Sequence, residues 1–467
     1  MEELKIVLNY PGDLDALGAR LADLPGFVRI CSRSDSATIE IISALPRKLL
    51  RNRDNQWTLT RYRENPAYPE ESNVIQENVL VDDPALYLSG WLDERAANQG
   101  NVFNGGLIGF LAYDAKSPSP TDTAPANRNS ATPLLQVGLY DWAILCNHQE
   151  QSCCIYFHPD CTSHRRTLIQ QRLSRTELRP RAFQLKQKFS ADQCRETYLH
   201  SFKRIQEYIQ TGDCYQINYA QRFSSTYKGD PWAAFCHIRK AVQPPYAAYI
   251  RTEHGAVLSF SPEQFLSIQD HKVRTAPIKG TRARGKTPEE DAALKEELAQ
   301  SVKDRAENLM IVDLLRNDLG LHAQTGSVQV TKLFEIQSFH NVHHMVTTIE
   351  ACKKTDVSPL KVLWDAFPGG SITGAPKKRA MEIIAELEPH SRSVYCGSIF
   401  WCSHSGQLNS NIAIRTLVCE GDQIYCWGGG GIVADSDAEK EYQESVNKVD
   451  YFMETLEKEF WAPGTEE

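Results

Sequence analysis

The chain has 467 residues, with 51 Lys and Arg against 59 Asp and Glu, and a formal net charge of −8. An acidic chain without a basic run or an aromatic-basic stripe is not suited to nucleic acid. Its first residues form no apolar signal segment, and no apolar run reaches the roughly eighteen residues that span a bilayer. We therefore expect a cytoplasmic protein that does not enter a membrane.

The thirteen cysteines are scattered along the chain. Only Cys153 and Cys154 are adjacent, and there is no Cys-x-x-Cys pair or Cys/His spacing typical of a zinc site. This pattern predicts reduced cysteines packed in the interior.

Residues 1–185 are expected to form mostly short strands. Segments such as LKIVLNY, ATIEIIS and LLQVGLYDWAILC alternate or run apolar over strand lengths. The stretch 117–133 is rich in Pro, Ser, Thr and Asn, and we interpret it as an exposed loop because strands resume directly after it. The length would allow two or three domains, but no long linker divides the chain. We expect this β-rich part and a second part, residues 186–460, to interleave as one globular unit.

The second part opens with a helix over 195–213 and is centred on residues 275–318. There a strand ends near Ile278, and Gly280 predicts a turn that carries Lys279. A long helix is then expected to start at Thr287 and Pro288 through a capping box. A lysine at such a strand-to-helix junction is a candidate functional residue.

Two carboxylates flank this lysine in the sequence. Glu263 follows Pro262 between two apolar runs, at the lip of a strand. Glu307 lies in RAENLMIVDLL, on a helix that is otherwise apolar, where a carboxylate needs a partner, a proton or a metal. A lone lysine in a turn is ordinarily a solvated charge, but these neighbours make Lys279 a candidate for catalysis.

Two glycine-rich segments follow. The loop in residues 367–387 opens a helix at Pro376 and presents backbone N–H groups to an anion. Near the end, a four-glycine turn precedes a last helix that we expect Ser436 to cap. Glu441, Glu444 and Lys448 share one side of that helix. A solvated, salt-bridged face is the alternative, but glycines that allow a ligand to approach the backbone favour a binding face.

Glu307 and Glu444 each lie on a predicted helix, from which they could bind a metal ion. Carboxylate oxygens with room for water suit magnesium rather than zinc. The nearby cations Lys448, Arg415 and Lys279 indicate a substrate with more than one carboxylate or phosphate.

Several motifs resemble those of the chorismate-utilising enzymes. They are PIKGT, DRAENLMIVDLLRNDLG, PGGSITGAPKKRAMEII, NIAIRT and GGGIVADS with EYQES. The segments GDCYQIN, YDWAIL and GGLIGFLAYD extend the resemblance into the amino-terminal half. The resemblance is dense over about residues 190–460. It implies an α+β fold of two large antiparallel sheets packed as a sandwich with flanking helices, and an active site in the carboxy-terminal portion.

Two positions divide the members of this family. In anthranilate synthases, the motif that resembles PIKGT has alanine where this chain has Lys279. Isochorismate and salicylate synthases have a water-activating lysine where this chain has Gln216. The pattern here resembles members that form 4-amino-4-deoxychorismate. The resemblance implies that Lys279 adds covalently to chorismate as the ring hydroxyl leaves, with Glu263 as general acid, and that ammonia then displaces the lysine.

The resemblance also implies the remaining site. It assigns Mg²⁺ to Glu307 and Glu444, with Glu441 near it, and it matches His344 to an active-site histidine, for which a buried histidine satisfied by hydrogen bonds is the alternative. The substrate's carboxylates are assigned to Tyr395, Arg415, Gly430, Gly431 and Lys448.

An effector pocket is a weaker expectation. Family members that hold tryptophan in the amino-terminal part have an aromatic, arginine-bearing loop after a serine, whereas here Ser32 runs directly into a strand. Pro245, Tyr246 and Ala247 still match one side of that pocket. The sequence thus predicts a candidate amino-acid pocket, vestigial in this chain.

The expected partners follow from what the motifs lack. No cysteine lies in the G-x-C-x-G elbow of an amidotransferase. We expect ammonia from a separate glutamine amidotransferase subunit and a lyase that takes the product toward 4-aminobenzoate and folate. The alternatives are the large subunit of an anthranilate synthase and a non-catalytic subunit that senses chorismate or tryptophan.

Overall fold

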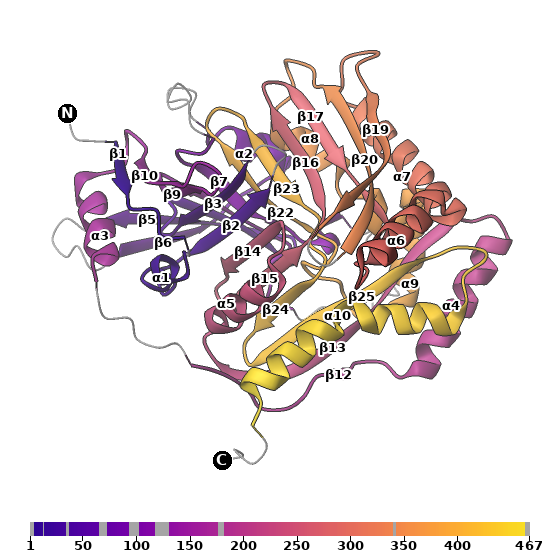
Figure 1. Cartoon of the computed structure of the whole chain (residues 1–467). Coiled ribbons are helices and arrows are strands. Elements are labelled where there is room, and N and C mark those ends of the chain that lie inside the picture. Colours follow the sequence, from indigo (N-terminus) through magenta and orange to yellow (C-terminus); the bar gives the residue numbers. More distant parts are fainter. Residues whose placement is uncertain are drawn as a thin grey trace.

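The computed structural model describes residues 4–12, 14–33, 37–64, 72–92, 102–116, 130–175, 182–339 and 342–462. Most of the loop predicted over 117–133 lies outside these residues. Two large antiparallel sheets pack against each other, and helices cover them (Figure 1). The predicted α+β sandwich is confirmed.

The first sheet has 13 strands, and its path mixes strands from both predicted parts of the chain. In spatial order it contains β1 (Lys5–Leu8), β10 (Ser152–Phe157), β9 (Trp142–Asn147), β3 (Thr38–Ser43), β2 (Val28–Arg33), β14 (Tyr246–Arg251), β15 (Gly255–Ser261), β24 (Thr416–Glu420), β25 (Gln423–Ile432), β13 (Gln216–Gly229) and β11 (Phe183–Leu185), while β12 (Ser190–Ala191) and β21 (Gly374–Ala375) also pair with β13.

The second sheet has 12 strands and is mixed in the same way. Its order is β18 (Ile278–Ala283), β20 (Val342–Cys352), β17 (Lys272–Ala276), β16 (Gln264–Gln269), β23 (Leu408–Asn411), β22 (Ser398–Ser403), β7 (Gly106–Leu111), β8 (Leu135–Tyr140), β4 (Lys48–Arg53), β5 (Gln56–Glu64) and β6 (Ser72–Asn78), and β19 (Gln329–Ser338) pairs with β20.

Helices lie around these sheets (Figure 1). They are α1 (Asp15–Ala19), α2 (Pro84–Ser89), α3 (Ser163–Leu173), α4 (Arg195–Gln210), α5 (Pro231–Val242), α6 (Pro288–Gln300), α7 (Val302–Gly320), α8 (Pro359–Ala366), α9 (Lys377–Leu387) and α10 (Ala438–Phe460), with 3₁₀ turns η2 (Tyr113–Lys116) and η3 (Gly370–Ile372). Among the described residues no helix combines the length and the apolar character needed to cross a membrane.

The first sheet buries apolar side chains on both faces. Val257 and Val418 belong to the core between the sheets, whereas Leu258 and Leu417 belong to a second core that α3, α5 and α10 cover. Because successive side chains of a strand point to opposite faces, such a strand is nearly continuously apolar. This explains why the strand segments of the sequence often run apolar instead of alternating.

Lys279 lies within strand β18, so the turn predicted there is wrong. Its neighbour Gly280 has a φ of +82°, and the register against β20 shifts between Ile278 and Thr281. A glycine with positive φ inside a strand marks a bulge, which redirects the adjacent side chains.

The long helix predicted after this strand is two helices. Thr287 caps α6 as expected, because its Oγ1 accepts a hydrogen bond of 3.2 Å from the Glu290 N–H. Ser301 then ends α6 with an extended backbone and caps α7, its Oγ accepting from the Asp304 N–H at 3.3 Å. A serine that can cap the next helix competes with helix continuation, and here it interrupts the helix.

The four glycines predicted to form a turn belong to strand β25, and Asp437, not Ser436, caps α10. A Cβ on Gly428 would lie 1.9 Å from the Ser445 carbonyl oxygen, and one on Gly429 would lie 2.5 Å from the Tyr219 carbonyl oxygen. The glycines are therefore needed for the close approach of β25 to α10 and to β13.

Two cysteines are not reduced, contrary to the prediction. Cys146 and Cys153 form a disulfide between β9 and β10, while the other eleven cysteines are free. The two residues are direct cross-strand partners with a Cα–Cα distance of 4.2 Å. Strand register creates this pair, and the spacing in the sequence does not reveal it.

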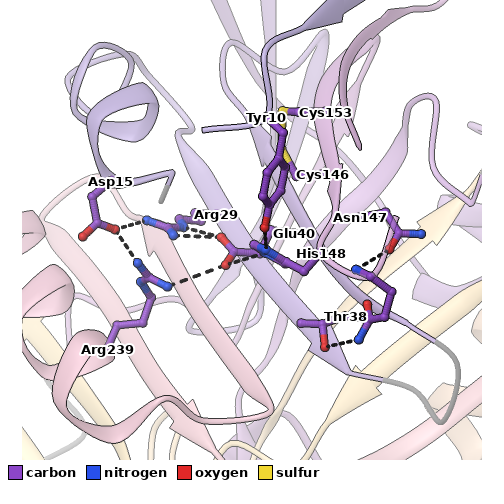
Figure 2. Close-up of polar contacts among 11 residues, drawn as sticks. Tyr10, Asp15, Arg29, Thr38, Glu40, Cys146, Asn147, His148, Cys153 and Arg239 are labelled. Carbon is purple, nitrogen blue, oxygen red and sulfur yellow. Dashed lines mark hydrogen bonds and ion pairs between the residues drawn. A yellow bond between two sulfur atoms is a disulfide. The ribbon is translucent and has the colours of Figure 1, made fainter. Parts of the chain in front are cut away.

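A buried network of charges joins the first sheet to α1 and α5 (Figure 2). Arg29, 1 % exposed, contacts Asp15 at 2.5 Å and Glu40 at 2.8 Å. Arg239 reaches Asp15 at 2.8 Å, and His148 Nε2 lies 3.2 Å from Glu40. Burial alone would raise the pKa of both carboxyls, but the arginines outweigh it and lower the pKa of each to about 2.

We expect Glu40→Gln to lower the free energy of unfolding by about 3 kcal/mol at pH 7, because Arg29 stays buried with only Asp15 to compensate it. In the wild type, the stability from Glu40 is complete above the ordinary glutamate pKa and is lost as the pH falls toward 2. Urea unfolding from pH 7 to pH 3 should therefore show a smaller loss of stability in the variant.

Glu253→Gln is the matched control for this experiment. Glu253 pairs with Arg51 at 2.8 Å but is 57 % exposed, so its loss should cost less than about 1 kcal/mol. Equal destabilisation by the two substitutions would contradict the role given to the network.

Candidate active site

The eleven catalytic, substrate-binding and metal residues named from the sequence all line one cavity of about 630 Å³. Strands β18 and β25, the turn η3, and helices α7 and α10 supply most of its wall. The structure thus brings together Glu263, Lys279, Glu307, His344, Tyr395, Arg415, Gly430, Gly431, Glu441, Glu444 and Lys448.

Glu263 and Lys279 meet at one residue of the cavity wall. The Ser371 hydroxyl donates a hydrogen bond of 2.8 Å to Glu263 Oε1, and Lys279 Nζ donates one of 3.3 Å to the Ser371 carbonyl oxygen. Burial raises the pKa of Glu263 and lowers that of Lys279. Both shifts favour the uncharged forms, which are a carboxylic acid that can give a proton and an amine that can attack carbon.

The three predicted metal-site carboxylates, Glu307, Glu441 and Glu444, lie in the same cavity. A Cβ on Gly430 would be 3.0 Å from Glu441 Oε2 and 3.6 Å from both Glu444 Oε1 and Lys448 Nζ, so these side chains gather above a residue that has none. Burial raises the pKa of Glu307 and of Glu441, and the charge of Glu444 adds to both shifts. A bound cation would relieve this repulsion.

The donor chemistry fits magnesium, whose usual ligands are carboxylate and water oxygens. Within the described ranges, no three His, Cys, Asp or Glu side chains stand close enough to form a ready metal cluster. Lys448 instead contacts Glu444 at 2.7 Å. An ion would therefore be held by few protein oxygens, as is common for magnesium.

The residues predicted to bind the substrate also line this cavity. Tyr395 stacks on Trp427, with ring centroids 6.0 Å apart and planes at 7°. Arg415 is partly buried, and its guanidinium has no hydrogen bond or ion pair to any described residue. A guanidinium that lines a cavity without a protein partner is suited to a carboxylate that arrives with the substrate.

His344 is held by a hydrogen bond between its Nδ1 and Thr281 Oγ1, at 2.8 Å. Burial, helped by the charge of Arg415, lowers its pKa to about 4. The imidazole is therefore neutral near pH 7 and acts as a hydrogen-bonding group, not as a charge.

The candidate effector residues do not all share one pocket. Pro245 and Ala247 line a second cavity of about 460 Å³, whose wall includes Glu40, Arg239 and His148 of the buried network. Ser32 instead accepts a hydrogen bond of 3.1 Å from Trp401 Nε1, and Tyr246 donates one of 3.0 Å to the Arg33 carbonyl.

Ser371, Thr281, Asn218 and Trp427 are among the residues of the main cavity that were missed in the sequence. Ser371 and Thr281 hold predicted site residues, and Asn218 and Trp427 line the wall. Ser371 lies in the PGGSITGAP motif, where the glycines drew attention to backbone N–H groups instead of the hydroxyl.

Comparison with known proteins agrees with this geometry. A family model described as chorismate binding enzyme matches residues 48–454. Aminodeoxychorismate synthase component 1 from Escherichia coli (strain K12) is 43% identical over 405 residues, 86% of this chain and 88% of that protein. Anthranilate synthase component 1 from Aquifex aeolicus (strain VF5) is 41% identical over 263 residues, 56% of this chain and 53% of that protein.

A solved structure shows similarity over the whole fold. Anthranilate synthase component I from Streptococcus pneumoniae TIGR4 superimposes with a TM-score of 0.74 at 26% identity, covering 90% of this chain and 93% of that one. The family model spans most of the chain, and the relative from Escherichia coli matches 86% of it, so the chain belongs to the chorismate binding enzyme family.

Proposed function

We propose that this chain converts chorismate and ammonia to 4-amino-4-deoxychorismate. The observation that carries this proposal is the meeting of Lys279 and Glu263 at Ser371, inside a cavity that also offers Arg415 and Lys448 to carboxylates. The similarity to aminodeoxychorismate synthase component 1 over most of both chains supports the same reaction. A complete set of reactive groups speaks against a purely sensing subunit.

The reaction proceeds in two steps. In the first, the neutral Lys279 amine forms a bond to a ring carbon of chorismate, while the ring hydroxyl takes the proton of Glu263 and leaves as water. The proton released from the lysine nitrogen returns to the Glu263 carboxylate. In the second, ammonia forms its bond at the carbon that bore the hydroxyl while the bond to lysine breaks, and Glu263 gives its proton to the departing Lys279 nitrogen, which leaves as the neutral amine. The new ammonium group then loses one proton to the Glu263 carboxylate, which restores the acid.

Glu307 and Glu444 would hold a Mg²⁺ ion, with Glu441 beside them. When bound, the ion supplies positive charge that neutralises a carboxylate of the substrate. Arg415 and Lys448 add charge to the same end, and neutral His344 adds a hydrogen-bonding group. This division leaves Lys279 free of the substrate's charges and available for bond formation.

The test of the function is product identification with the purified chain, chorismate, ammonium and magnesium, with a lyase added to release 4-aminobenzoate. Anthranilate as the product would favour the second candidate, an anthranilate synthase large subunit, which the relative from Aquifex aeolicus brings into consideration. Lys279 stands against that candidate, because anthranilate synthases resemble this motif but have alanine there.

Without ammonia, the wild-type chain should accumulate an adduct with the mass of chorismate less one water on the peptide that contains Lys279. Added ammonium should remove it. Intact-protein and peptide mass spectrometry measure both, and the peptide that contains Lys303, an exposed lysine of the same cavity, is the internal control.

The variant Lys279→Ala distinguishes two roles for Lys279, a nucleophile and an anchor for a substrate carboxylate. If Lys279 is the nucleophile, the variant loses the adduct, and slow direct addition of ammonia gives the anthranilate-type isomer. An unmodified wild type, together with a variant that still makes only the 4-amino product, would show that Lys279 is an anchor.

The source of ammonia can be tested separately. We propose that a separate glutamine amidotransferase subunit supplies it, since no glutaminase elbow is present in the sequence. The purified chain should therefore use ammonium salts and be inactive with glutamine, as measured by product formation and glutamate release. Glutamine hydrolysis by the purified chain alone would contradict this.

Glu307→Gln and Glu444→Gln should each abolish turnover, because each removes a charged oxygen ligand from magnesium. Titration calorimetry with Mg²⁺ should show weakened binding, while circular dichroism stays unchanged. Glu454→Gln, at an exposed position of the same helix α10, is the matched control. Wild-type rates in excess chelator would contradict the metal requirement.

A further inference from the structure

One residue of the cavity wall touches both reactive groups. Ser371 lies in the 3₁₀ turn η3, its hydroxyl donating to Glu263 Oε1 at 2.8 Å and its carbonyl accepting from Lys279 Nζ at 3.3 Å. The acid and the amine come from the β15–β16 junction and from β18, so this turn is their shared contact.

The turn is fixed in place from several sides. Thr373 Oγ1 donates a hydrogen bond of 3.0 Å to the Gly369 carbonyl and closes the turn. A Cβ on Gly370 would lie 2.3 Å from Leu314 Cδ2 of α7, and one on Gly369 would lie 2.7 Å from Ile412 Cδ1. Because the backbone is seated this closely, Ser371 can hold its two partners in constant positions.

We propose that Ser371 is a positioning residue that aligns the acid Glu263 with the nucleophile Lys279. When Glu263 is protonated, the serine hydroxyl that donates to Oε1 favours the proton on Oε2, because the carbonyl oxygen of a carboxylic acid is the better acceptor. A neutral lysine amine that donates one N–H to the Ser371 carbonyl has the direction of its lone pair restricted. This inference rests on the proposed function.

Several neighbouring groups set the pKa of Glu263, and the Ser371 hydroxyl is one of them. Burial raises the pKa of this carboxyl, while the Ser371 hydrogen bond, Lys279 of β18, the Ile278 N–H and Lys448 of α10 lower it. The charge of Glu263 in turn raises the pKa of the Cys396 thiol. Of the side chains that lower the pKa of Glu263, Ser371 is the one whose polar group can be removed without removing a charge, and its backbone contact with Lys279 then remains.

The test compares Ser371→Ala with Ser371→Thr in steady-state amination of chorismate with ammonium. Loss of the hydroxyl should lower kcat about tenfold and change KM for chorismate by less than about twofold, because alignment matters in the transition state. The Glu263 limb of the kcat/KM profile should move about one pH unit upward, since a donor that stabilised the carboxylate is gone. Threonine retains a hydroxyl and should restore both.

Thr373→Ala is the matched control, because it loosens the same turn without touching Glu263 or Lys279. It should lower the melting temperature and leave the pH profile in place. An equal profile shift in this variant, a change of KM alone in Ser371→Ala, or a wild-type kcat and profile in Ser371→Ala would each overturn the proposal. A wild type that forms no amination product would instead contradict the proposed function.

Discussion

The cavity depends on the close approach of strand β25 to helix α10. Gly428 to Gly431 carry no side chains, and this lets the helix lie on the strand closely enough for Glu441, Glu444 and Lys448 to reach the space above Gly430. A single methyl group at Gly428 would meet the helix backbone. The acidic and basic groups of α10 thus enter the site because the strand beneath it is bare.

Burial is the second constraint, and it acts on the proposed acid and the proposed nucleophile in opposite directions. The same low-polarity setting raises the pKa of Glu263 and lowers that of Lys279. In the amino-terminal network the outcome differs, because arginines surround Glu40 and hold it ionised despite burial. Glu40 and Glu263 therefore differ in whether the neighbouring positive charge outweighs the effect of burial on the pKa.

A site residue could be predicted from the sequence where its polar or charged side chain was unusual among its neighbours. Glu307 was identified as a polar residue on an apolar helix, and Lys279 by the carboxylates near it. Their convergence on one cavity follows from the family fold. The contact of Ser371 with Glu263 joins positions 108 residues apart, and the disulfide depends on strand register, so neither can be derived from spacing in the sequence.

The turns predicted at Gly280 and at the four glycines of β25 were wrong for the same reason. Glycine serves close packing and bulges inside strands as readily as turns.

The mixing of early and late strands in both sheets has a consequence for how the protein acquires its site. β2 pairs with β14, and β15 pairs with β24, so the first sheet is continuous only after most of the chain is available. Pairings this distant in sequence give a high contact order and slow folding. The cavity wall is completed by α10, near the last described residue. During synthesis the cavity would therefore stay incomplete until α10 had left the ribosome, and in the meantime the unpaired strand edges would need protection.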